Sequence, residues 1–232
     1  MRIFLAGAAG AIGRRLVPLL QGAGATIIGT TRSPEKAAAL RDAGVEPVIV
    51  DMFDADAVHR AVQAAQPDFV IHQLTDLPAI SDPDALAAAR PRNARLRAVV
   101  TPILMQAAKA AGAQRAVVQS IGFVYAGGIS PHRESDPVVA PGVVELETAT
   151  LGTQGIEGVV LRYGRLWGPG TWASRPTGLA APLHVDAAAH AALLALTRGS
   201  PGIYNIAEND GTIDTTKAVQ QLGFDPSFRL PT

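Results

Sequence analysis

Three glycines at intervals of three, Gly7, Gly10 and Gly13, lie where an apolar N-terminal run gives way to a helical pattern. Residues 2–6 are typical of a short buried strand, and apolar residues recur at helical spacing behind the glycines. A tight strand-to-helix turn needs residues without a Cβ, and a diphosphate approaches the backbone only where no side chain intervenes. The first N–H groups and the dipole of the helix favour such an anion. The run therefore predicts a cradle for the phosphates of a dinucleotide, with a purely structural glycine turn as the alternative.

Apolar, strand-like runs alternate with alanine-rich helical stretches through the first two thirds of the sequence. This alternation predicts an α/β fold in which a doubly wound parallel sheet of the Rossmann type is covered on both faces. The expected strands are residues 3–6, 26–30, 47–50, 68–72, 116–119, 159–162 and 203–206.

Capping residues place several helices between these strands. Ser33 followed by Pro34 is typical of a helix start, Gly44 of a helix end, and Asp54 of a further N-cap. The other expected helices are residues 92–111, whose start is blurred by two prolines, 185–198 and 216–222.

The charge balance limits the partners. Twenty basic residues offset twenty acidic ones, so the chain offers no electrostatic footprint for nucleic acid or an anionic membrane. No segment is long and apolar enough to span a bilayer, and the pair Arg14 and Arg15 interrupts what could be a secretory signal. The absence of cysteine excludes disulfides and thiolate chemistry. We expect a small-molecule partner and a cytoplasmic location.

Six elements in a specific order resemble the extended or atypical short-chain dehydrogenase/reductases of the NAD-dependent epimerase/dehydratase family. The resemblance covers nearly the whole chain and is carried by these motifs: the Gly-x-x-Gly-x-x-Gly of residues 7–13, Asp51, the Val-Ile-His of 70–72, Gln119-Ser120 before Val124-Tyr125, the Leu-Arg-Tyr-Gly of 161–164 with the Trp-Gly-Pro-Gly of 167–170, and the His-Val-Asp of 184–186. It implies a single domain over residues 1–232, in which 168–183 and 207–232 form a small, truncated C-terminal substrate lobe.

The same resemblance implies which residues contact the cofactor. They are Gly7, Gly10, Ala11, Ile12 and Gly13 at the pyrophosphate, Asp51 at the adenine amino group, and Leu74 and Thr75 along the ribose and nicotinamide. Asp51 has a structural alternative as a strand-end cap, and apolar lining near Leu74 needs no ligand.

The end of the second expected strand distinguishes between cofactors. NAD-specific proteins place a carboxylate there, whereas a 2′-phosphate needs positive charge and hydroxyl donors. This chain has Thr30, Thr31, Arg32 and Ser33, so NADP is predicted and NAD is the alternative. A solvated loop arginine is the structural interpretation of Arg32.

The family's catalytic Tyr-x-x-x-Lys is missing. Four residues after Tyr125, Tyr163 and Tyr204 stand an isoleucine, a tryptophan and a glutamate, and alignment places Val139 and Val143 at the dyad positions. Tyr125, just past the fifth strand, is the best remaining proton donor, and Ser120 could reach a bound carbonyl. A packed loop aromatic and a strand-end hydroxyl are their structural alternatives.

Other polar and aromatic residues carry weaker predictions. His132, Glu134 and Asp136 could act in acid/base chemistry, but a solvated loop is the favoured interpretation, and no metal site is expected. His184 and His190 are expected to cap or cover a helix, and Trp167 and Trp172 to pack in the core or to line a substrate pocket.

Three functions remain compatible with these features. The first is an NADP-dependent oxidoreductase acting on a small carbonyl or hydroxyl compound, with Tyr125 or water as proton source. The second is a non-catalytic NAD(P)H-binding sensor or regulatory protein, and the third a lyase, isomerase or cyclase. The short stretch 171–183 argues against nucleotide-sugar substrates. Relatives of this kind often form homodimers, and a homodimer is therefore a further expectation.

Overall fold

The computed structural model describes residues 1–78 and 82–231. Its centre is a parallel sheet of seven strands in the order β3-β2-β1-β4-β5-β6-β9. The strands are β1 (Arg2–Ala6), β2 (Thr26–Thr31), β3 (Glu46–Ile49), β4 (Phe69–His72), β5 (Arg115–Ile121), β6 (Glu157–Tyr163) and β9 (Gly202–Ile206). The predicted doubly wound α/β fold is therefore confirmed.

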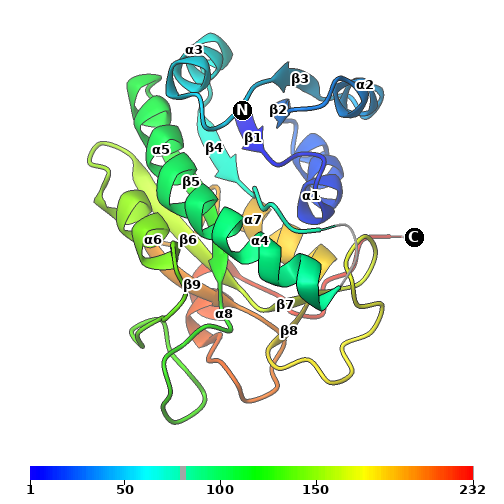
Figure 1. Cartoon of the computed structure of the whole chain (residues 1–232), viewed down its shortest axis with the longest axis vertical. Coiled ribbons are helices and arrows are strands. Elements are labelled where there is room, and N and C mark those ends of the chain that lie inside the picture. Colours follow the sequence, from blue (N-terminus) through cyan, green and yellow to red (C-terminus); the bar gives the residue numbers. More distant parts are fainter. Residues whose placement is uncertain (79–81, 232) are drawn as a thin grey trace.

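Helices cover both faces of this sheet (Figure 1). One face carries α1 (Ala11–Gly22), α2 (Pro34–Asp42), α7 (Val185–Leu194) and α8 (Thr216–Leu222), and the other carries α3 (Ala55–Ala65), α4 (Pro83–Arg95), α5 (Thr101–Ala110) and α6 (Val143–Gly152). Each face has its own apolar core, since the central strands are buried on both sides and present apolar side chains to each. No helix of the described residues is long and apolar enough to cross a membrane.

The helix expected at residues 92–111 begins earlier than predicted. It starts at Pro83, behind the N-cap Asp82, and continues through one π-helical turn, η1 (Leu96–Val100), into α5. Pro91 does not end the helix, because the carbonyl it leaves unpaired belongs to Ala87, which is exposed to water. Pro102 also lacks a backbone N–H. It lies just after the π-helical turn, whose wider hydrogen-bond spacing accommodates the missing hydrogen bond. The helix expected at 185–198 ends earlier, at Leu194.

A small second sheet lies beyond the carboxyl edge of the main one. It pairs β7 (Arg165–Trp167) with β8 (Pro182–His184), and a long loop joins the two strands. Sequence reasoning assigned no strand to this proline-rich and glycine-rich stretch.

An ion pair joins distant parts of the chain. Arg15 of α1 pairs with the buried Asp186 of α7, which also accepts a hydrogen bond from the N–H of Leu230.

Candidate functional site

The glycine turn lies at the carboxyl edge of the sheet, between the ends of β1 and β4, where the strand order reverses. Gly7 has φ +96°, and a Cβ there would lie 2.8 Å from the carbonyl carbon and oxygen of Gln73. A Cβ on Gly13 would lie 2.3 Å from the Gly7 oxygen. Both glycines are therefore required by close backbone packing, whether or not a ligand binds. The place is also the crevice in which ligands of doubly wound sheets bind.

The start of α1 offers free hydrogen-bond donors. Gly10 precedes the helix and its carbonyl accepts the N–H of Arg14, at 3.0 Å. In the part of the chain that the structure describes, the N–H groups of Ala11, Ile12 and Gly13 have no acceptor. No acidic side chain occupies the first turn. Three donors at the positive end of a helix dipole could hold a diphosphate, and the predicted phosphate contacts of this turn stay a prediction.

Arg32 and Asp51 end neighbouring strands of the same edge, and both are exposed. Within the described residues Arg32 has no hydrogen-bond or ion-pair partner, and Ser33 beside it caps α2 through Lys36 N. Asp51 accepts the N–H of Phe53 through one oxygen, at 3.0 Å, so the expected structural role exists. Its second side-chain oxygen has no hydrogen-bond partner within the described residues.

The segment that follows β4 is fixed to the long helix. The ring of the buried His72 accepts the Leu74 N–H through Nδ1 at 3.2 Å, and its Nε2 lies 3.2 Å from Thr101 Oγ1. Further on, Asn93 of α4 binds both the N–H and the carbonyl of Asp76, at 2.9 and 3.0 Å. Burial, followed by the charge of Arg97, lowers the pKa of His72 to about 4. His72 is therefore a neutral residue that orients Leu74, one of the expected cofactor contacts.

Gln73 is a buried polar residue whose place sequence reasoning missed. Its Nε2 donates to the Tyr163 hydroxyl at 3.3 Å, and that hydroxyl donates to the Ala188 carbonyl at 3.2 Å. Burial raises the pKa of Tyr163, so this tyrosine stays neutral. The Oε1 of Gln73 is buried without a partner in the described part of the structure. An unpaired buried acceptor is costly, and this one belongs to a residue whose backbone packs against Gly7.

The two expected catalytic hydroxyls belong to one buried network. Ser120 Oγ donates to Glu147 Oε1 at 2.8 Å, and Glu147 forms an ion pair with Arg162. Arg162 donates to the Tyr125 hydroxyl at 3.1 Å, and that hydroxyl donates to Asn205. Burial raises the pKa of Tyr125 against the lowering effect of Arg162. Each hydroxyl hydrogen is thus already engaged, and a proton transfer from either would first break a hydrogen bond.

The aligned dyad positions carry no polar group in the structure. Val143 is buried as the first residue of α6, and Val139 is exposed just before it. The three lysines of the chain lie in α2, α5 and α8, as Lys36, Lys109 and Lys217. The standard Tyr-Lys proton relay is therefore absent.

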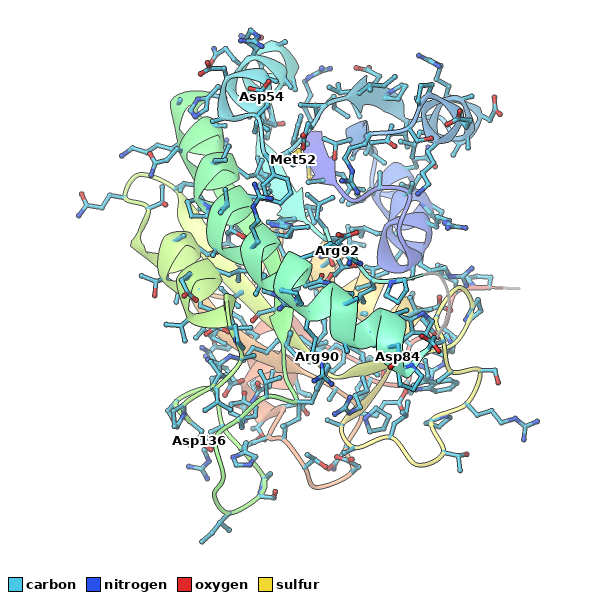
Figure 2. The ribbon with its side chains drawn as sticks, viewed as in Figure 1. Met52, Asp54, Asp84, Arg90, Arg92 and Asp136 are labelled. Carbon is cyan, nitrogen blue, oxygen red and sulfur yellow. The ribbon has the colours of Figure 1, made fainter. Side chains whose placement is uncertain are left out.

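The polar loop after β5 is exposed over most of its length, and three of its side chains contact this network. His132 stacks on the Tyr125 ring with centroids 4.9 Å apart and pairs with Asp136, which Figure 2 shows at the lower edge of the molecule. Glu134 accepts the N–H of Asn205 at 2.9 Å. These groups hold the loop against Tyr125, and the described residues contain no cluster that could hold a metal.

The tryptophans and remaining histidines are structural in their contacts. Trp167 donates to Glu208 at 3.1 Å and meets the edge of His184, which caps α7. Trp172 is not a core residue: it is largely exposed and donates to the Pro78 carbonyl at 3.1 Å. His190 stacks on Phe228.

Comparison with known sequences finds related proteins. Residues 3–183 match the model of the NAD-dependent epimerase/dehydratase family. The chain is 36% identical over 247 aligned residues to a 3-diazoavenalumate denitrifying reductase from a Streptomyces species, covering 90% of this chain and 77% of that protein. It is 49% identical over 72 residues to an uncharacterized protein of Schizosaccharomyces pombe, covering 31% of this chain and 24% of that protein.

Solved structures share the fold. A UDP-glucose 4-epimerase of Thermotoga maritima with UDP-glucose superposes with a TM-score of 0.79 at 18% identity, covering 99% of this chain and 94% of that one. A UDP-glucuronic acid 4-epimerase of Bacillus cereus, in complex with UDP-glucuronic acid and NAD, superposes with a TM-score of 0.76 at 17% identity, covering 99% and 95%.

Proposed function

Because the chain belongs to the NAD-dependent epimerase/dehydratase family, we propose that it binds NADP(H) and reduces a small molecule by hydride transfer. The observation that carries this proposal is the start of α1, where three N–H groups have no acceptor among residues 1–78 and 82–231, beside the crevice between β1 and β4. The cofactor supplies the hydride. The residues of this chain bind the cofactor, orient its nicotinamide and hold the substrate.

The preference for NADP rests on the end of β2. Arg32 is exposed, has no partner within the described residues, and follows two threonines at the end of β2, where we expect the 2′-phosphate. A planar guanidinium binds a phosphate through two parallel hydrogen bonds. The expected contacts of Asp51, Leu74 and Thr75 with the adenine and nicotinamide halves belong to the same proposal.

A reductase is favoured because a relative covering most of the chain is named as one. The missing dyad limits the chemistry, since Val139 and Val143 cannot move a proton. Orientation of a bound hydride donor can still supply several kcal/mol of the barrier reduction. Tyr125 and water are the two proton sources compatible with the structure, and Ser120 is placed to contact a substrate oxygen only if its bond to Glu147 is broken.

The substrate is proposed to be a small carbonyl or hydroxyl compound. We assign residues 168–183 and 207–232 to the substrate lobe. Only the rest of the loop after β7 and the short strand β8 separate the Gly-Pro-Gly motif from α7. Such a short segment offers little surface for a nucleotide sugar.

Cofactor binding and turnover can be measured separately. NADPH and NADH titrations, followed by the fluorescence of the reduced nicotinamide, are expected to show tighter binding of NADPH. Loss of NADPH absorbance is then followed against aldehydes, ketones, quinones and an aryl diazo compound, the last because of the named relative. Failure to bind either dinucleotide would overturn the proposal.

A second function is favoured by the absent dyad and by the engaged hydroxyls of Ser120 and Tyr125. It is a non-catalytic NAD(P)H sensor. Tight NADPH binding without turnover of any compound, together with a protein partner that copurifies, would support this function over the reductase.

A homodimer is also proposed, and the mass measured by light scattering during gel filtration tests it.

A further inference from the structure

Arg97 is a half-buried guanidinium at the middle of the long helix. It lies in the π-helical turn η1, and within residues 1–78 and 82–231 it has neither a hydrogen-bond acceptor nor an ion-pair partner. We propose that Arg97 binds a carboxylate group of the substrate, so that this protein acts on small organic acids. The inference rests on the proposed function for the hydride donor, and it adds the substrate class.

The neighbours of Arg97 on its helix show which way it faces. Asn93, four residues before it, contacts the backbone of Asp76, and Thr101, four residues after it, contacts His72. Residues four apart lie on one side of a helix. Arg97 therefore lies between these two contacts, along the segment that contains Leu74 and Thr75. The lowered pKa of His72, to which the charge of Arg97 contributes, agrees with this placement.

The nearby carboxylates are already paired. Asp76 forms an ion pair with Arg92 at 2.8 Å, and Glu147 of the adjacent α6 forms one with Arg162 at 2.7 Å. Burial lowers the pKa of Arg97, and no carboxylate offsets this effect. A cation removed from water without a counter-ion is costly, and a bound anion would compensate that cost.

The other arginines of this helix are engaged or exposed. Arg92 is held by Asp76, and Arg95 lies over the Phe53 ring at 4.6 Å from its centroid. Figure 2 shows Arg90 and Arg92 on opposite sides of α4, with Arg92 toward the loop that follows β4. Arg90 is exposed and thus provides a matched control for removing one positive charge from this helix.

A carboxylate is the anion of choice at this position. The phosphates of a dinucleotide are expected at the N-terminus of α1, so the anion beside Leu74 and Thr75 comes from the substrate. A guanidinium binds a carboxylate by two parallel hydrogen bonds and would fix the orientation of a small acid over the nicotinamide. One end of the substrate is then anchored while the other receives the hydride.

The experiment uses the full chain saturated with NADP⁺. Benzoate and cinnamate, with benzamide and cinnamamide as neutral counterparts, are titrated by calorimetry into the native protein, Arg97→Gln, Arg97→Lys and the control Arg90→Gln. We expect the carboxylates to bind the native protein at least about tenfold more tightly than the amides. Arg97→Gln removes this preference, Arg97→Lys keeps part of it because the charge remains, and Arg90→Gln leaves it unchanged.

Several outcomes would overturn the inference. Carboxylates that bind the native protein no better than the amides exclude it without any variant, even if Arg97→Gln fails to fold. A loss of NADPH affinity in Arg97→Gln, with carboxylate affinity unchanged, assigns the residue to the cofactor instead. Native protein that binds NADPH but shows no carboxylate preference refutes only this inference, whereas native protein that binds neither dinucleotide refutes the proposed function.

Discussion

Glu147 of α6 and Arg162 of β6 form an ion pair inside the protein, in which Arg162 donates from Nε to Oε1 at 2.8 Å and from Nη2 to Oε2 at 2.7 Å. Both side chains are almost fully buried. Oε1 also accepts the hydroxyl hydrogen of Ser120, and Arg162 reaches Tyr125 through Nη1. The pair therefore joins the two hydroxyls that the sequence singled out as catalytic candidates.

Glu147→Gln is expected to lower the free energy of unfolding by about 3 kcal/mol, because the charge of Arg162 stays buried without its partner. Chemical denaturation measures this loss. Glu145→Gln is the control, since Glu145 is an exposed carboxylate on the same helix, and we expect a change within about 0.5 kcal/mol. Equal effects of the two substitutions would show that the buried pair adds nothing to stability.

Gly13→Ala is expected to reduce NADPH affinity by at least about tenfold and to destabilise the fold by about 2–4 kcal/mol. The added methyl would lie 2.3 Å from the Gly7 oxygen and 2.5 Å from the Ala8 oxygen, so the cradle must deform. Gly22→Ala in the same helix meets nothing within 4 Å and should raise stability by up to about 1 kcal/mol. NADPH titration and thermal unfolding of both variants check this, and a Gly13→Ala protein that binds normally would contradict it.

Arg32→Ala is expected to raise the Kd for NADPH about tenfold or more while leaving that for NADH unchanged, because only NADPH has a 2′-phosphate. Arg41→Ala, which removes an exposed arginine from α2, should change neither value. Fluorescence titration with both dinucleotides is the measurement. Equal weakening of NADH would place Arg32 outside the 2′-phosphate site.

His72 makes stability depend on pH below neutrality. Its pKa falls from 6.5 to about 4 on folding, so between these values the unfolded chain binds a proton that the folded protein excludes. Above pH 6.5 both states hold His72 neutral, and this residue does not lower the stability. As the pH falls from 6.5 to 4, its protonation in the unfolded chain lowers the free energy of unfolding by about 3 kcal/mol. His72→Asn, whose amide oxygen can still accept the Leu74 N–H, should show a flatter profile in denaturation at several pH values. An identical slope in the variant would exclude His72 as the cause.

Tyr125→Phe tests the proton source. Since the hydroxyl hydrogen already binds Asn205, we expect water to serve instead and kcat to change by less than about threefold. Stability should fall by about 1 kcal/mol through the lost hydrogen bonds. A hundredfold loss of turnover with unchanged NADPH affinity would assign the proton transfer to Tyr125.

The strands were predictable because a parallel sheet buries both faces, which leaves continuous apolar runs in the sequence. The helix start at Pro83 was missed although Asp82-Pro83 repeats the signature of Ser33-Pro34. Pro91 blurs the expected start at residue 92, and the exposure of Ala87 explains why the helix tolerates this proline.

The tight glycine turn could be predicted from the sequence, because glycine spacing reflects close backbone packing. Gln73 and Arg97 could not be predicted, since each is notable only for a polar group without a partner in the described structure: the buried Oε1 of Gln73 and the half-buried guanidinium of Arg97. That property depends on which side chains of distant segments surround a residue. A glutamine in place of an apolar residue at a strand end was the one available signal for Gln73.

The ion pair of Arg15 with Asp186 spans 171 positions of the chain and joins α1 to α7. During synthesis, α1 emerges long before α7, the helix that anchors it. The apolar face of α1 therefore stays unpacked until α7 has been made. The cradle would thus be among the first parts made and among the last to become rigid. A ribosome-bound chain arrested before α7 should therefore leave the turn at Gly7 open to proteolysis, while the released protein protects it.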